Sequence, residues 1–166
     1  VNGNNYSKAI EYIETLHQRS ASMDQAYQKA TYLKGAELFN KEEYAEAVKA
    51  FEKSLASPAD PKYVALASFW NGEAFSIGRK YAEAIPVYQK VIGLSASIEP
   101  EILTKTRYGL GYAHFNLQQY DQALFNFKEF VNKSAKGQAN YVDGIIRLAD
   151  CYYVSKSYTE AVAQYN

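Results

Sequence analysis

Two histidines and one cysteine are the side chains of this sequence with the widest range of chemistry. His17 and His114 lie almost a hundred residues apart in the sequence, and such a pair makes a poor metal site. Cys151 has no neighbouring base that would activate a thiol. We interpret the histidines as packed or partly exposed and Cys151 as a small buried side chain. No phosphate loop, serine-nucleophile motif or convincing carboxylate pair is present, so we predict no enzyme, no cofactor and no metal.

The composition of the chain excludes several further classes of protein. The chain of 166 residues has room for one ordinary domain or one block of repeats. Lys+Arg and Asp+Glu both number 18, and this balance argues against broad electrostatic binding to nucleic acid or anionic membrane. Hydrophobic residues at 48% exclude global disorder. A single cysteine excludes an intrachain disulfide. No stretch approaches the roughly 18 uninterrupted apolar residues of a transmembrane helix.

An internal repeat organises the chain. One tyrosine recurs at intervals of 38, 37, 39 and 38 residues. An alanine follows each tyrosine by three positions, a large apolar residue follows by seven, and a small residue precedes the later tyrosines by nine. The columns are Tyr6, Tyr44, Tyr81, Tyr120 and Tyr158; Ala9, Ala47, Ala84, Ala123 and Ala161; Ile13, Phe51, Tyr88, Phe127 and Tyr165; and Gly35, Gly72, Gly111 and Ala149. Four columns in one register predict a repeat protein.

Each unit contains two patterns of helical period, and no pattern of period 2 competes. Asp60 before Pro61 predicts one helix start, Glu99 before Pro100 another, and Ser22 with Gln25 suggests a capping box. The nine expected helices lie near residues 6–19, 23–39, 43–56, 61–77, 80–94, 99–117, 119–133, 138–155 and 157–166. They predict four hairpins preceded by one unpaired helix.

The recurrent glycines lie inside expected helices, where each costs about 1 kcal/mol relative to alanine. A gain in packing must offset this cost. We expect each glycine to face the alanine column of its hairpin, as Gly35 would face Ala47, so that the two helices cross closely. The large apolar residue seven after the tyrosine would then fill the space towards the next unit. Because a lone hairpin leaves an apolar face exposed to solvent, the units must stack.

These columns resemble the tetratricopeptide repeat, whose pattern has a small residue, an aromatic, an alanine and a second aromatic in this order. The resemblance covers nearly the whole chain, although the family's usual period is 34 residues. It implies an all-α, right-handed superhelical solenoid of helix hairpins, with first helices lining a concave groove. The expected segments are 1–22, the second helix of a truncated repeat, and then repeats at 23–60, 61–98, 99–137 and 138–166, the last truncated.

The resemblance also implies a peptide-binding groove, because family members usually bind peptides or protein segments and rarely catalyse reactions. Its register places aromatic side chains there, with Glu73 and Asp150 as acceptors. The alternative is that many of these rings pack against neighbouring helices. The family's carboxylate clamp would need a lysine aligned with Tyr32, Phe69 or Tyr108, and none is present. The predicted peptide-binding residues are Tyr32, Phe39, Phe69, Glu73, Tyr108, Tyr112, Phe115, Asp150 and Tyr153.

The predicted function is a non-catalytic scaffold for a protein or peptide partner, with no nucleic acid and no direct membrane insertion. The alternative is a spacer or assembly platform joined to an enzymatic or sugar-binding domain outside these residues. Both ends of the chain fall in mid-pattern, so we expect a fragment of a longer protein whose solenoid ends self-associate. Residues 70–74 and 81–85 are similar to longer-period repeats of bacterial cell-envelope proteins, including Tol-Pal-associated ones. A periplasmic or cell-envelope location is expected on that resemblance.

Pro86 is a second sequence feature, besides the glycines, that is unfavourable inside a helix. It lies five residues after Tyr81, where the other units have residues that can donate a backbone N–H. A proline inside a helix removes one hydrogen bond and clashes with the carbonyl four residues back, here that of Ala82. We therefore expect the helix to bend or loosen at this point.

Overall fold

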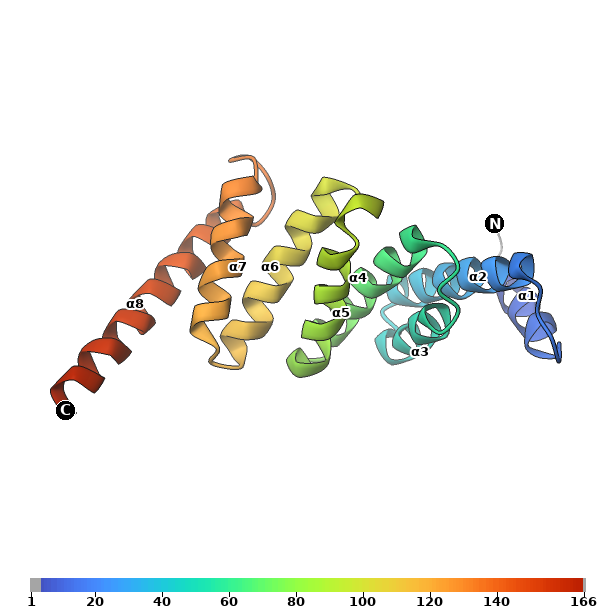
Figure 1. Cartoon of the computed structure of the whole chain (residues 1–166), viewed down its shortest axis with the longest axis horizontal. Helices are drawn as coiled ribbons and strands as arrows, with labels where there is room; N and C mark the ends of the chain where they lie inside the picture. Colours follow the sequence, from blue (N-terminus) through green and yellow to red (C-terminus); the bar gives the residue numbers. More distant parts are fainter. Residues whose placement is uncertain (1–3, 166) are drawn as a thin grey trace. The chain divides into compact units, whose positions relative to one another are not determined.

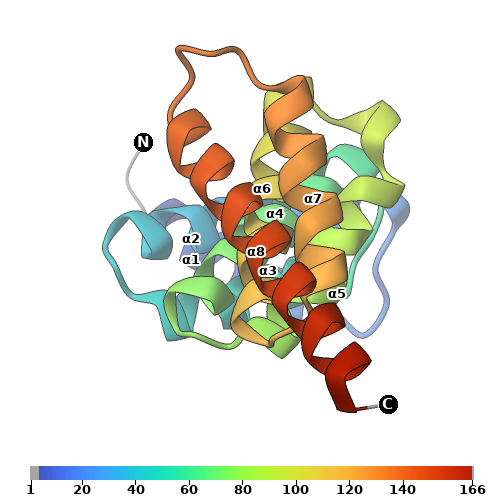
Figure 2. The same ribbon diagram turned by 90° about the vertical axis from the view of Figure 1, so that its left-hand side faces the viewer.

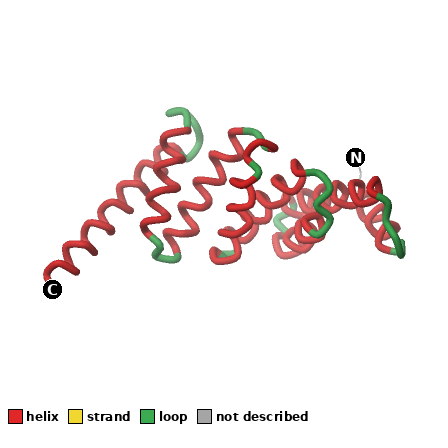
Figure 3. Tube along the Cα trace, viewed as in Figure 1, coloured by secondary structure: helices red, strands yellow, loops and turns green. Residues whose placement is uncertain are grey.

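The computed structural model describes the backbone of residues 4–165 and the side chains of residues 5–156. Eight α-helices and one short 3-10 helix make up this part of the chain, and it contains no strand (Figures 1 and 3). The predicted all-α class is therefore confirmed. The helices are α1 (Asn4–Glu14), α2 (Ala21–Asn40), α3 (Tyr44–Leu55), α4 (Pro61–Ile77), α5 (Tyr81–Gly93), η1 (Ser95–Ser97), α6 (Pro100–Asn116), α7 (Tyr120–Lys133) and α8 (Tyr141–Tyr165).

Two compact units divide the chain at Glu99 and Pro100. Unit 1 holds α1 to α5 with η1, and unit 2 holds α6 to α8. In unit 1, α2 pairs with α3 and α4 with α5, and α1 packs against α2. Its core contains Phe51, which packs between Ala47 of its own helix and Ala67 of α4. A second cluster joins Ile10 and Ile13 of α1 to α2.

Unit 2 consists of the α6–α7 hairpin and α8, which packs against α7 (Figures 1 and 2). Phe127 and Ala123 of α7 meet Cys151 of α8 in the core of this unit. Gly144 of α8 allows the close approach, since a Cβ built there would lie 2.6 Å from the ring of Phe130. The first half of α8 is thereby fixed against α7.

Three hairpin turns share one geometry. The residue two before the recurrent tyrosine has a positive φ in each of them: 62° at Glu42, 57° at Arg79 and 59° at Gln118. The next residue donates its N–H back into the preceding helix, as Glu43 does to the Leu38 carbonyl at 2.9 Å. The N–H of Glu42 itself bonds to the Phe39 carbonyl at 2.9 Å, which completes a Schellman motif. In these three hairpins the constant interval of nine residues from the glycine to the tyrosine therefore reflects a repeated turn of fixed length.

The recurrent glycines face aromatic rings, so the predicted partner was wrong. A Cβ on Gly35 would lie 2.6 Å from the Phe51 ring, and one on Gly72 would lie 2.5 Å from the Tyr88 ring. Gly111 stands in the same relation to Phe127, at 2.7 Å. The ring seven after the tyrosine is long enough to reach across the hairpin and supplies the nearest atoms to each glycine. The glycine column thus makes room for the second aromatic column within one hairpin.

The helix starts agree in part with the predictions. Asp60 caps α4 by accepting from the Lys62 N–H at 2.9 Å, with Pro61 at the first helical position, as predicted. The cap of α2 is Ser20 and not Ser22, because the Ser20 hydroxyl accepts from the Met23 N–H at 3.3 Å. Helix α1 ends at Glu14, five residues short of the expected end.

The end of the chain differs from the expectation. Separate helices were expected at 138–155 and 157–166, but α8 runs without interruption from Tyr141 to Tyr165. The turn residue equivalent to Glu42, Arg79 and Gln118 is Lys156, which is helical here. The described chain therefore forms three hairpins, and the fourth expected hairpin is not formed. The repeat boundaries inferred from the columns stay a prediction.

Helix α5 continues through Pro86, which is its sixth residue. The first hydrogen bond of this helix runs from the Ala84 N–H to the Lys80 carbonyl at 3.0 Å. Pro86 thus lies beyond the first turn, where a missing N–H leaves a carbonyl without its helical partner. The expected bend stays a prediction.

Candidate protein-interaction surface

In unit 1 the predicted rings of α2 are half-buried and in contact with other rings. Tyr32 lies 5.3 Å, centroid to centroid, from Tyr63. Phe39 meets Trp70 edge-on at 5.1 Å. Such contacts hold the rings in place and leave part of each exposed. The role of Tyr32 and Phe39 in peptide binding stays a prediction.

Two predicted residues of α4 offer little to a ligand. Phe69 is only 2% exposed, so it does not fit the prediction of a ring that contacts a ligand. Glu73 accepts a hydrogen bond from the Tyr88 hydroxyl at 2.6 Å. Burial, together with the Glu73 carboxylate, raises the pKa of Tyr88 far above its usual range. Glu73 thus stabilises its own hairpin.

In unit 2 the rings of Tyr108 and Tyr112 project from α6 and are half-buried. Their centroids lie 4.9 Å apart in an edge-to-face contact. Behind them are Phe130, 5.0 Å from Tyr108, and Phe127, 5.3 Å from Tyr112. Phe115, a turn further on, packs against Tyr120 at 5.6 Å. The three predicted rings of α6 therefore share one face of that helix.

Helix α8 completes this face with two charged side chains that were not predicted. Asp143 Oδ2 accepts from the Tyr108 hydroxyl at 2.8 Å and also from the Tyr112 hydroxyl. Arg147 donates from Nε to the Tyr112 hydroxyl at 3.1 Å and from Nη1 to Asp150 Oδ2 at 2.7 Å. We call Tyr108, Tyr112, Asp143, Arg147 and Asp150 the tyrosine–aspartate cluster. The sequence signal for it is the 4 and 3 spacing of its three α8 members, which places them on one helix face.

The hydrogen bonds and charges of the cluster keep Asp143 ionised and both tyrosines protonated. Burial disfavours the charged form of Asp143, but hydrogen bonds from Tyr112 and Tyr108 and the charge of Arg147 outweigh it, so its pKa lies below the usual range. Burial and the bond to Asp143 raise the pKa of both Tyr108 and Tyr112. The two hydroxyls therefore stay protonated and donating at neutral pH. Two carboxylates and one guanidinium leave the cluster with one excess negative charge.

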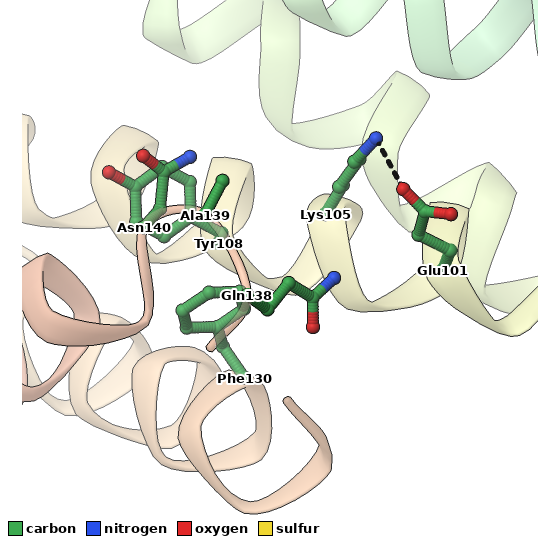
Figure 4. A pocket seen from close by; sticks show the side chains of 7 residues that line it. All are labelled: Glu101, Lys105, Tyr108, Phe130, Gln138, Ala139 and Asn140. Atoms are coloured by element: carbon green, nitrogen blue, oxygen red, sulfur yellow. Dashed lines mark ion pairs between the residues drawn. The ribbon is translucent and has the colours of Figure 1, made fainter. Parts of the chain in front are cut away.

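A hollow of about 200 Å³ adjoins the cluster, since Tyr108 belongs to both (Figure 4). The Lys105 ammonium pairs with Glu101 at 2.8 Å on one side of it. Its lining combines rings with amide and charged side chains: Glu101, Lys105, Tyr108, Phe130, Gln138, Ala139 and Asn140.

The last predicted aromatic, Tyr153, is 76% exposed on α8. It lies three residues after Asp150 and therefore on the same side of the helix. In unit 2 the structure thus places four predicted residues, Tyr108, Tyr112, Asp150 and Tyr153, on α6 and α8, with Phe115 one turn further along α6.

The histidines and the cysteine occupy ordinary positions. His114 is buried, and its Nδ1 lies 2.6 Å from Gln119 Oε1. His17 is exposed. Cys151 is buried in the core of unit 2, and burial raises its pKa to about 11, so it is a thiol at neutral pH. Among the described residues, no group of three His, Cys, Asp or Glu side chains could hold a metal ion. None of the helices searched in that part of the chain is long and apolar enough to cross a membrane.

Stacked helix hairpins with a repeated turn define an α-helical repeat protein. Two family models, both described as tetratricopeptide repeat, match residues 32–97 and 106–136 and together cover more than half of the chain. The chain belongs to the tetratricopeptide repeat family, and its fold is the all-α solenoid of that family.

Solved structures that are similar to the chain include two of MamA. One is "MamA 41-end from Desulfovibrio magneticus RS-1", which is 18% identical with a TM-score of 0.59, over 97% of this chain and 93% of that one. The other is "MamA RS-1 ArsTM double mutant", which is 15% identical with a TM-score of 0.58, over 93% of this chain and 97% of that one. At this identity the likeness shows the fold alone. No curated protein sequence matches the chain. The resemblance to bacterial cell-envelope repeats stays a prediction.

Proposed function

We propose that the chain is a non-catalytic scaffold that binds a peptide or protein segment on the face formed by α6 and α8. One observation carries the proposal: the tyrosine–aspartate cluster sets two half-exposed rings beside charged groups, with Tyr153 exposed on the same side of α8. Tyrosine and arginine are enriched among the residues that dominate binding energy at protein interfaces. A periplasmic or cell-envelope location remains part of the same proposal.

The charge of the cluster favours particular ligands. Asp143 already accepts two hydroxyls, whereas Asp150 uses one oxygen in its pair with Arg147 and offers the other. With one negative charge in excess, the surface favours a segment that presents a lysine, an arginine or a free N–H. A ligand carboxylate would have to compete with Asp143 and Asp150 for Arg147.

The surface is also organised before a ligand arrives. Tyr108 packs on Phe130, and both tyrosine hydroxyls are fixed by Asp143. Ordering a rotamer-rich side chain on binding costs about 0.5–1.5 kcal/mol, and the packed tyrosines avoid most of that cost. Rigid rings beside an exposed acceptor suit the binding of an extended or helical segment.

The test uses random 12-residue peptides displayed on phage and selected against the 166-residue chain. Affinities of the selected peptides are then measured by isothermal titration calorimetry for Tyr153→Ala and Asp150→Asn. We expect Tyr153→Ala to weaken binding at least tenfold, since an aromatic anchor contributes about 2 kcal/mol when buried by a partner. Its helical circular-dichroism signal should not change, because Tyr153 is mostly exposed.

The matched control is Tyr12→Ala, which removes an exposed tyrosine from α1 of the other unit. It should bind the peptides as the unaltered chain does. Selected peptides enriched in Lys or Arg would support the charge argument. Peptides that bind Tyr153→Ala and Asp150→Asn as tightly as the unaltered chain would refute the assignment to this face.

A further inference from the structure

The first half of α8 carries an apolar face that nothing in the described chain covers. Val142 is 67% exposed, Ile145 42% and Tyr152 51%, and Ala149 is also exposed. Their spacing of 3, 4 and 3 residues places them along one side of the helix. We call these four residues the α8 apolar face.

The same face is used in the first helix of every other hairpin. The equivalent positions in α4 are Ala65, Ser68, Gly72 and Phe75, of which the first three are buried. In α2 and α6 the equivalents are Gln28, Thr31, Gly35 and Leu38, and Thr104, Arg107, Gly111 and His114, and each is buried or half-buried. In each hairpin the glycine position contacts the second aromatic column of the following helix, as Gly72 contacts Tyr88.

The sequence that would cover the α8 apolar face is present in the same chain. The spacing of Tyr120, Ala123 and Phe127 recurs at Tyr158, Ala161 and Tyr165. The first three residues belong to α7, the helix that packs on α6. Since α8 is one continuous helix to Tyr165, its backbone does not turn back towards the face as the other hairpins do. Each molecule therefore contains the sequence of both halves of a hairpin interface, but the continuous helix α8 does not form that hairpin.

The turn explains why a straight helix competes with a hairpin here. The other hairpins hold a non-glycine residue at positive φ, namely Glu42, Arg79 and Gln118. This conformation is unfavourable for residues with a Cβ. A continuous α8 keeps Lys156 helical and avoids the strained residue.

We propose that a second copy of this chain covers the α8 apolar face, by reciprocal exchange of residues 158–165. The segment of each copy would lie along the α8 apolar face as α7 lies along α6. Because Ala149 carries a Cβ where the other hairpins have glycine, Tyr165 of one copy would pack beside Ala149 of the other and not directly over it. Such an exchange gives a closed two-fold interface in which both copies use the same contacts. The formal net charge of the chain is zero, so no net repulsion opposes the pairing.

The first experiment measures mass by light scattering during size-exclusion chromatography of the 166-residue chain across a range of concentrations. We expect a dimer for the unaltered chain and a monomer for Ile145→Asp, which places a charge in the α8 apolar face. The control Ile77→Asp alters a similarly exposed isoleucine at the end of α4 and should stay dimeric. Lys156→Gly, which relieves the strain of a turn, should shift the dimer towards monomer. A monomer at every concentration for the unaltered chain would overturn the proposal.

The second experiment distinguishes exchange from closure within one molecule. Ala149→Cys and Tyr165→Cys are combined with Cys151→Ala, the last of which matches the equivalent residues Ala74 and Ala113. After mild oxidation, a non-reducing gel should show a cross-linked dimer. A monomer with an internal disulfide would mean that the chain's own segment folds back, and the proposal would fail. Either Cys substitution alone serves as the control for random cross-linking.

Discussion

Gly111 lies against the ring of Phe127, so close that a Cβ on Gly111 would come within 2.7 Å of the ring. The ring is fully buried and cannot move aside without disturbing the core of unit 2. We predict that Gly111→Ala lowers the free energy of unfolding by about 1–3 kcal/mol, the usual cost of overpacking, although alanine is the better helix former. Urea unfolding followed by circular dichroism measures this change.

Gly93→Ala is the matched control, because a Cβ at Gly93 meets nothing within 4 Å and the residue ends α5. It should be neutral or stabilising by up to about 1 kcal/mol. Equal effects of the two substitutions would mean that the glycine column serves no packing role.

The repeat was predictable because its columns are set by a turn of constant length and by rings that always meet a small residue. The error over the glycine partners arose because spacing alone does not tell how far a side chain reaches across a hairpin. The failure at α8 has another cause. A small difference in energy decides whether Lys156 stays helical or adopts the positive φ of a turn. The residue type does not reveal this difference, since Glu42, Arg79 and Gln118 adopt a positive φ with equally ordinary side chains.

The candidate surface was predictable only in part. Tyr108 and Tyr112 were found from their register, but their partners Asp143 and Arg147 lie about 35 residues away. Nothing in the local sequence pairs a hydroxyl with a distant carboxylate. Phe69 shares the register and yet is buried, because the exposure of a groove position depends on the neighbouring helices.

Gln28 joins α2 to the start of α4 with both atoms of its side-chain amide. Its Nε2 donates to the Asp60 carbonyl at 3.0 Å, and its Oε1 accepts from the Asp60 N–H at 2.8 Å, in a fully buried position. Gln28→Glu would set a carboxylate oxygen against the Asp60 carbonyl. We predict a loss of about 2–4 kcal/mol in the free energy of unfolding at pH 7.

The loss should shrink at lower pH, because a protonated carboxyl donates as the amide does. Chemical unfolding at pH 7 and pH 4.5 makes the comparison. The control Gln122→Glu changes an exposed glutamine and should alter stability by less than about 0.5 kcal/mol. A Gln28→Glu protein as stable as the control at pH 7 would contradict the role of this amide.

Pro86 should cost stability despite the continuity of α5. Pro86→Ala restores an N–H for the Ala82 carbonyl, worth up to about 3 kcal/mol in a helix interior, and loses about 1 kcal/mol through a freer unfolded chain. The expected net gain is about 1–2 kcal/mol, seen as a higher urea midpoint. The reverse change at the equivalent exposed position, Lys49→Pro in α3, should cost about 3 kcal/mol or more. A neutral Pro86→Ala would indicate that α5 already accommodates the proline by bending.

Asp143 should make the stability of unit 2 depend on pH on the acid side. Its pKa is below the usual range in the folded chain, and about 3.9 is expected in the unfolded chain. A carboxyl with a lowered folded pKa stabilises the fold above the unfolded value, and this contribution is lost as the pH falls through the folded value. Asp143→Asn should therefore cost about 1–3 kcal/mol at pH 7, and its difference from the unaltered chain should shrink below about pH 4.

Urea unfolding of both proteins between pH 7 and pH 2.5 gives the difference curve, in which the other carboxylates cancel. The control Asp121→Asn removes an exposed carboxylate from the first turn of α7 and should cost only about 0.5 kcal/mol through the helix dipole. The hydroxyls of Tyr108 and Tyr112 provide an independent check. Freed from Asp143, both should ionise at lower pH, seen as an earlier rise in tyrosinate absorbance for Asp143→Asn. A pH-independent difference in stability would mean that Asp143 acts by packing and not by charge.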